Sequence, residues 1–183
     1  MNRYERLRRV LIVCHHCLTN IAYYRGGYSG KKPTYDRESN FWLTANGNFL
    51  DAAVLAWCKL FASKEAHNWK RVVPTASQDA FEARLLKAAG MTATGWADYN
   101  NRMRAYRDKF VAHLDSEKTM HLPMLDPAIK STFYYAEYLL DNEASLVTLP
   151  DGDVNFRARY KKQKQEAERI YGKKRHSLGP TGD

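Results

Sequence analysis

Hydrophobic residues recur at steps of three and four positions along most of the chain, which is the period of an amphipathic helix. The first such stretch covers residues 3–25 and stops at two consecutive glycines. Its apolar stripe consists of Leu7, Val10, Leu11, Cys14, Leu18 and Ile21. A polar loop over residues 28–38 follows, and no segment alternates apolar and polar residues over a useful strand length. The pattern therefore predicts an all-α protein.

Capping residues and helix breakers divide the rest of the chain into five further helices. Their predicted starts are Ser39 or Asn40, Thr75 or Ser77, Thr94 or Gly95, Asp126, and about residue 154. The second helix of the chain runs to about residue 63, the third ends at Gly90, and the fourth reaches about residue 115. Gly47 interrupts the second helix on its apolar face, which predicts close approach of a neighbouring helix backbone.

These helices predict an up-and-down bundle of about five helices followed by a basic C-terminal helix. The 183 residues of the chain are enough to bury a core. We place the bundle in residues 1–150 and a basic helical tail, with a disordered end, in residues 151–183. The Leu149-Pro150-Asp151-Gly152 stretch marks the boundary.

Charge is concentrated near the C-terminus. The chain carries a formal charge of +9, and residues 157–175 hold nine basic side chains against two acidic ones. This segment accounts for +7, so the rest of the chain sums to only +2. A nearly neutral body with a basic end indicates an acidic partner, of which nucleic acid is the commonest. The alternative is a solvated terminus that only aids solubility.

Other compositional features favour a protein of the cytoplasm. No apolar run approaches the roughly 20 residues of a membrane span, and the N-terminus lacks the core of a signal peptide. The three cysteines are an odd number, which argues against a disulfide framework. Cys14 and Cys17 lie close together, but no second pair of zinc ligands stands at a familiar spacing. We therefore expect these thiols to fill the core, and we expect no metal and no cofactor.

A short motif falls near the end of the fourth predicted helix. Arg107 is followed by Asp108, and His113 stands six positions after the arginine. With Tyr106 before it and Leu114-Asp115 after it, this string resembles the Arg-x(4–6)-His signature of the HEPN superfamily. Within that superfamily it looks like the AbiU-like abortive-infection or toxin branch. Trp57-Cys58-Lys59-Leu60-Phe61 resembles the second core helix of that branch. The resemblance covers roughly residues 1–145.

This resemblance implies a metal-independent endoribonuclease of a phage-defence or toxin–antitoxin system. It implies RNA as substrate, a homodimer whose motif helices meet near the two-fold axis, and a cognate antitoxin protein as a possible partner. One subgroup of the superfamily carries a tyrosine three positions after the histidine as a modification site. Ser116 occupies that position here, so this form of control is not expected.

The residue types in the motif suit RNA cleavage. His113 can move protons at neutral pH, and the planar guanidinium of Arg107 matches phosphate oxygens. Asp108 is the expected helper that orients one of them. On an ideal α-helix the arginine and histidine project about 120° apart and about 9 Å along the axis, so one protomer holds them loosely. A supporting polar residue on an earlier helix is expected, and four candidates remain: Asn46, Asn48, Asp51 and Glu65.

Two groups of basic residues are the candidate RNA contacts. They are Arg102, Arg104 and Lys109 near the motif, and Arg157, Arg159, Lys161 and Lys162 on the basic helix. Two alternatives stand beside the nuclease. A histidine in the last turn of a helix often interacts only with the negative helix end. The chain could also be a catalytically inert helical module that binds nucleic acid or another partner.

Overall fold

The computed structural model describes residues 2–112, 124–143 and 155–172, and its architecture is all-α as predicted. The α-helices are α1 (Arg3–Gly26), α2 (Asn40–Phe61), α3 (Trp69–Val72), α4 (Gln78–Ala89), α5 (Ala93–Tyr106), α6 (Asp126–Glu143) and α7 (Phe156–Gly172). A 3₁₀ turn over Thr75–Ser77 precedes α4, and a π-helix over Arg107–Ala112 follows α5. The loop after α1 contains a short antiparallel hairpin of β1 (Tyr28–Ser29) and β2 (Lys32–Pro33), which the sequence pattern did not predict.

Local sequence explains where the helices begin and end. Asn2 caps α1 in a capping box with Glu5, and the Thr92 side chain accepts a hydrogen bond from the Gly95 amide at the start of α5. α4 ends at Gly90, which takes the left-handed conformation with φ of 69°. The starts predicted for α2, α4 and α6 are confirmed to within a few residues.

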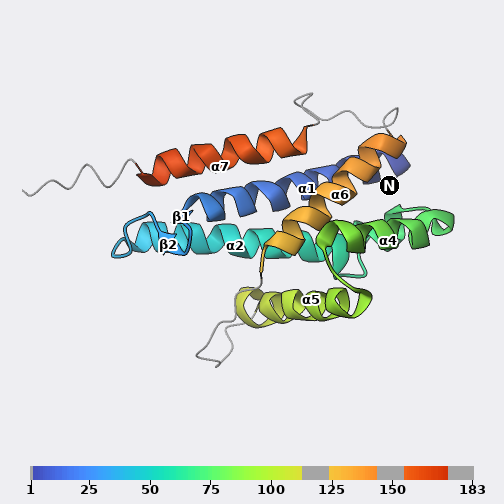
Figure 1. The fold of residues 1–183 in the computed structure, drawn as a ribbon, viewed down its shortest axis with the longest axis horizontal. Coiled ribbons are helices and arrows are strands. Elements are labelled where there is room, and N and C mark those ends of the chain that lie inside the picture. Colours follow the sequence, from blue (N-terminus) through green and yellow to red (C-terminus); the bar gives the residue numbers. More distant parts are fainter. Residues whose placement is uncertain (1, 113–123, 144–154, 173–183) are drawn as a thin grey trace, which may run out of the picture.

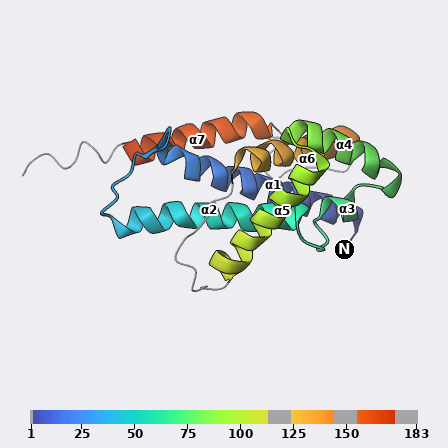
Figure 2. The ribbon, with the colours of Figure 1, turned by 60° about the horizontal axis from the view of Figure 1, so that its bottom comes forward.

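The helices are arranged around the α1–α2 pair (Figure 1). α2 returns beside α1, while α7 runs along another side of α1. α5 lies on the far side of α2 from α7 and crosses α2 obliquely (Figure 2). α6 packs against α1 and α4. α5 and α7, which hold the two groups of candidate RNA contacts, therefore lie on opposite sides of the bundle.

The core is centred on Trp57 of α2. Its ring lies 5.5 Å from Trp96 and 5.1 Å from Tyr99, and its indole N–H donates to the Ser131 hydroxyl at 3.0 Å. Most tyrosine and tryptophan rings of the apolar stripes are buried here or packed against this core. Cys14 and Cys17 are fully buried, as predicted, and burial raises the pKa of the Cys17 thiol to about 12. These thiols fill space in the core.

α7 shares the core of the bundle. Phe156, Ala167 and Tyr171 are buried, and Gly26 of α1 allows the two helices to approach closely. A methyl group at Gly26 would overlap Ala167 and sit 3.0 Å from the Lys164 carbonyl oxygen. The close approach predicted at Gly47 is wrong, because that glycine is exposed and a methyl group added there would have no neighbouring atom within 4 Å. The basic helix that we expected as a tail is thus packed onto α1.

Candidate active site

The motif begins where α5 changes its geometry. The fourth helix was predicted to continue as an α-helix to about residue 115, but the α-helix ends at Tyr106 and Arg107–Ala112 form a π-helix. π-helical turns are rare and occur often at functional sites. The 120° offset expected between the arginine and the histidine was derived for an ideal α-helix, and a π-helix has a wider turn. His113 itself lies outside the described residues.

Arg107 and Asp108 form an ion pair although they are neighbours in the chain. The Arg107 Nε donates to Asp108 Oδ1 at 2.7 Å, and this hydrogen bond raises the pKa of the guanidinium above its usual value. Arg107 is therefore charged at every pH of interest. Within the described part of the chain, its two Nη nitrogens make no hydrogen bond. They remain available to an anion, while Asp108 fixes the orientation of the guanidinium plane.

Asp51 is the earlier-helix carboxylate that contacts the motif segment. The Tyr106 hydroxyl donates to Asp51 Oδ1 at 2.7 Å, which ties the last residue of α5 to the middle of α2. Burial, and then this hydrogen bond, raise the pKa of the Tyr106 phenol. The phenol stays protonated and keeps donating. Asp51 therefore positions the residue that immediately precedes Arg107.

The other three earlier-helix candidates take different places. Asn46 is buried away from the motif and donates to the Tyr24 carbonyl at 3.1 Å and to the Tyr171 hydroxyl at 3.2 Å. Asn48 is exposed on α2. Glu65 is exposed in the loop after α2 and lies within electrostatic reach of Arg107, whose pKa it helps to raise.

Cys58 of α2 lies within electrostatic reach of Arg107. Its side chain is buried, and burial raises the pKa of the thiol to about 12 while Arg107 lowers it to a smaller extent. The thiol is protonated at neutral pH, so it is a poor nucleophile. Cys58 therefore belongs to the buried core near the motif and not to its chemistry.

A basic groove leads along α5 toward Arg107. We call it the α5 groove; its volume is about 480 Å³ and it lies between the end of α2, α3 and α5. Its lining consists of Phe61, Ala62, Ser63, Lys64, Asn68, Lys70, Arg71, Ala97, Asn100, Asn101 and Arg104. Four of these side chains are cationic, three are amides, and none is a carboxylate. Arg104 donates to Asn101 at 2.7 Å and precedes Arg107 by three residues, so both arginines lie on the same side of the segment.

The structure separates the predicted RNA contacts into two groups. Arg102 and Arg104 are exposed on α5, and Lys109 is half-buried in the π-helix. On α7, Lys161 and Lys162 are exposed and Arg159 is half-buried. Arg157 is committed to the fold: it donates to both oxygens of Glu137, at 2.5 and 3.0 Å, and its guanidinium lies 4.6 Å from the Phe133 ring centroid. Of the two groups, only Arg102, Arg104 and Lys109 are close to Arg107 in the chain and on the same side of the bundle.

Sequence reasoning missed the cations that the α3 segment contributes. Lys64, Lys70 and Arg71 line the α5 groove, but they stand in a stretch that carries no motif. The adjacent pair Lys70-Arg71 was the available signal. Their position follows from Trp69, whose ring is buried and stacks on Phe81 at 5.0 Å. That anchor fixes α3 against α4.

Comparisons of the chain with protein-family models, with curated proteins and with solved structures give no match. Among the described residues, no three or more histidine, cysteine, aspartate or glutamate side chains gather where they could hold a metal ion. In the same part of the chain, no helix is both long and apolar enough to cross a membrane.

Proposed function

We propose that this chain is a metal-independent endoribonuclease of the HEPN type, acting in a phage-defence or toxin–antitoxin system. The observation that carries the proposal is the state of Arg107. Its guanidinium is charged and oriented by Asp108, and both Nη nitrogens make no hydrogen bond within the described residues. Arg104, three residues before it, lines a groove whose described lining residues include four cations and no carboxylate. This arrangement is suited to binding the phosphate of a phosphodiester.

The chemistry follows from these groups and from His113. The 2′-hydroxyl of the substrate attacks the adjacent phosphorus, and the bond to the 5′-oxygen breaks. The attacking 2′-hydroxyl loses a proton and the leaving 5′-oxygen gains one. His113 serves as the general base or acid in this transfer, which is typically worth about 10²–10⁴ in rate. Arg107 holds the phosphate oxygens bidentately and stabilises the charge of the transition state. The substrate strand lies in the α5 groove, where Arg104, Lys70 and Arg71 contact its backbone.

A homodimer completes the proposed site. In this arrangement the Arg107–His113 segments of two protomers meet near the two-fold axis and line a shared cleft. A protein antitoxin is the proposed inhibitor, and it would cover the same cleft. Light scattering at tens of micromolar tests the assembly. A monomer at that concentration contradicts the shared cleft.

Paired substitutions test the catalytic assignment. We expect Arg107→Ala and His113→Ala each to reduce RNA cleavage by about 100-fold or more with the fold unchanged. Lys87→Ala is the matched control, because Lys87 is an exposed cation on α4 outside the α5 groove. Cleavage is expected to persist in excess EDTA, to leave 2′,3′-cyclic phosphate ends and to spare DNA. Full activity of a well-folded His113→Ala protein contradicts the assignment.

The same groove supports one other function. A basic, amide-lined groove can hold nucleic acid without cleaving it. In that case wild-type protein binds RNA with a salt-sensitive affinity, shows no cleavage, and Arg104→Ala weakens binding. His113→Ala discriminates the two proposals: the nuclease loses cleavage and keeps binding, whereas the binding module has no cleavage to lose.

A further inference from the structure

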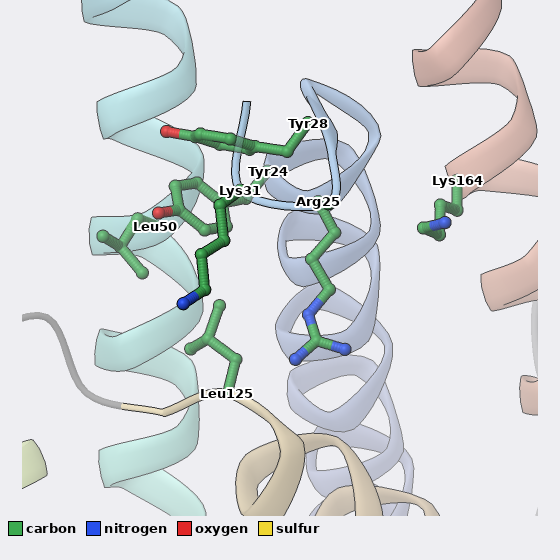
Figure 3. Close-up of a pocket in the computed structure, with 8 residues that line it drawn as sticks. Tyr24, Arg25, Tyr28, Lys31, Leu50, Leu125 and Lys164 are labelled. Atoms are coloured by element: carbon green, nitrogen blue, oxygen red, sulfur yellow. The ribbon is translucent and has the colours of Figure 1, made fainter. Parts of the chain in front are cut away.

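A second basic pocket lies beside the hairpin, and none of its lining residues belongs to the α5 groove. We call it the hairpin pocket; its volume is about 510 Å³, within the roughly 300–1,000 Å³ typical of small-molecule sites. Its lining consists of Tyr24, Arg25, Tyr28, Gly30, Lys31, Leu50, Leu125 and Lys164 (Figure 3). These residues come from α1, the hairpin, α2, the start of α6 and α7, so the pocket exists only in the folded chain.

Three cations line the hairpin pocket, and no carboxylate does. Arg25 comes from the last turn of α1, Lys31 from the hairpin turn and Lys164 from α7. Lys31 and Arg25 extend in the same direction, to the level of Leu125, while Lys164 lies apart from them on α7, on the other side of Arg25 (Figure 3). Positive charge gathered around a pocket favours an anionic ligand.

Exposed carboxylates outside the lining partly balance these cations. Arg25 donates to Asp126 at 2.8 Å, and Lys164 pairs with Glu168 at 2.7 Å. The Asp126 side chain is 70 % exposed and that of Glu168 is 44 % exposed. Such exposed pairs are worth about 0–1 kcal/mol, so a multivalent anion can replace them. Lys31 has no ion pair within the described residues.

The backbone of the hairpin presents Lys31 to the pocket. Gly30 and Lys31 form the two-residue turn between β1 and β2, and Gly30 has a φ of 60°. Two-residue hairpin turns favour glycine at a position with positive φ. Aromatic contacts hold the hairpin in place: Tyr28 lies 5.9 Å from Tyr35, which lies 5.5 Å from Tyr171 of α7. Lys31 is therefore carried on a braced turn.

The remaining walls are aromatic and apolar. The Tyr24 and Tyr28 rings lie 5.2 Å apart, and Leu50 and Leu125 add apolar surface to the lining. A ligand that fits both halves of the pocket carries a phosphate for the cations and a flat ring for the tyrosines. Aromatic side chains stack on any base, because every base has a π-face.

We propose that the hairpin pocket binds a phosphate-bearing small molecule of the size of a mononucleotide. Arg25 and Lys31 hold the phosphate, Lys164 adds positive charge at the rim, and the ring of the ligand packs against Tyr28 and Tyr24. The site is independent of the proposed nuclease function, because its residues are not those of the α5 groove and its test measures binding.

Calorimetric titration of the full chain tests the proposal with adenosine and uridine 5′-monophosphates, adenosine and inorganic phosphate as probes. We expect one mononucleotide to bind per chain, inorganic phosphate to bind more weakly, and adenosine to lose at least tenfold in affinity. Lys31→Ala should weaken mononucleotide binding about tenfold, as loss of one charge-assisted phosphate contact does. Lys32→Ala is the matched control, because Lys32 neighbours Lys31 in the same hairpin but does not line the pocket.

Three results overturn the proposal. One is equal affinity for adenosine and its monophosphate, which means that the cations do not contact the ligand. Another is an equal effect of Lys31→Ala and Lys32→Ala, which indicates attraction by general surface charge. The last is Lys31-dependent binding of an oligoribonucleotide when neither mononucleotide binds, which assigns the pocket to a nucleic-acid strand.

Discussion

Two regions of the molecule are rich in arginine and lysine: α5 with the π-helix that follows it, and α7. They use these charges differently. On α7, Arg157 donates to Glu137 and its guanidinium lies over the Phe133 ring. On α5, Arg104 contacts an amide, and the Nη nitrogens of Arg107 make no hydrogen bond within the described residues. Formal charge in a sequence therefore overstates what α7 can offer a partner.

The two segments are also attached differently. α7 is held along its length by close backbone contact with α1 at Gly26 and by the buried Phe156 and Tyr171. The junction of α5 and the π-helix is tied to α2 by the hydrogen bond from Tyr106 to Asp51. One basic helix is a structural part of the bundle, while the other ends in a segment that the hydrogen bond from Tyr106 to Asp51 ties to α2.

The largest expected effect concerns the attachment of α7. Gly26→Ala should lower the free energy of unfolding by about 1–3 kcal/mol, because the added methyl overlaps Ala167 at the helix contact. Gly47→Ala is the matched control and should raise it by about 0.5–1 kcal/mol, since Gly47 is an exposed helical position with open space around it. Urea denaturation monitored by circular dichroism measures both. Effects of the same sign would mean that α7 does not dock on α1 as described.

A smaller effect is expected at the attachment of the motif segment. Tyr106→Phe should lower the free energy of unfolding by about 0.5–1.5 kcal/mol, because Asp51 loses its hydrogen-bond donor. Hydrogen exchange should quicken locally, at the amides of residues 104–112. Tyr4→Phe is the control, since Tyr4 is 41 % exposed and has no hydrogen bond within the described residues. Unchanged exchange in Tyr106→Phe would show that other contacts hold the motif.

The smallest expected effects separate structural from available charge on α7. Arg157→Ala should cost up to about 1 kcal/mol of stability, through loss of an exposed ion pair and its ring contact, and should leave RNA affinity unchanged. Lys161→Ala should leave stability unchanged. If α7 contacts RNA, the same substitution should reduce the slope of log binding constant against log salt concentration by about one. Thermal melts and binding titrations at several salt concentrations measure the two. If Arg157→Ala lost RNA affinity and Lys161→Ala did not, Arg157 would be the available charge on α7 and the comparison would be wrong.

Periodicity and capping signals were sufficient to predict the longer helices, while the four-residue α3 (Trp69–Val72) was not predicted. The bounds of α1, the start of α2 at Ser39-Asn40 and the end of α4 at Gly90 follow from residues within a few positions of each boundary. The π-helix at Arg107 could not be predicted in this way, because its hydrogen bonding depends on how the end of α5 meets α2. The roles of Gly26 and Gly47 could not be predicted from local sequence either, because they depend on whether another helix packs against each glycine.

The candidate site was predicted in part. Arg107 and Asp108 were named from the motif, and their hydrogen bond is present. The choice of Asp51 among four polar residues needed the position of Tyr106 in space. Cations of the α5 groove come from two helices about thirty residues apart, α3 with Lys70-Arg71 and α5 with Arg104, and no local pattern joins them. The catalytic roles and the likeness to HEPN proteins stay predictions.

The contact between Trp42 and Tyr171 gives the protein an internal optical probe. The two rings lie 5.1 Å apart, one on α2 and the other at the end of α7, whereas Trp57 and Trp96 lie in the core and Trp69 stacks on Phe81. With those three tryptophans replaced by phenylalanine, emission at the red edge of the absorption band would come from Trp42 alone. The emission wavelength of Trp42 would then report in real time whether α7 stays packed against α2, without any attached dye.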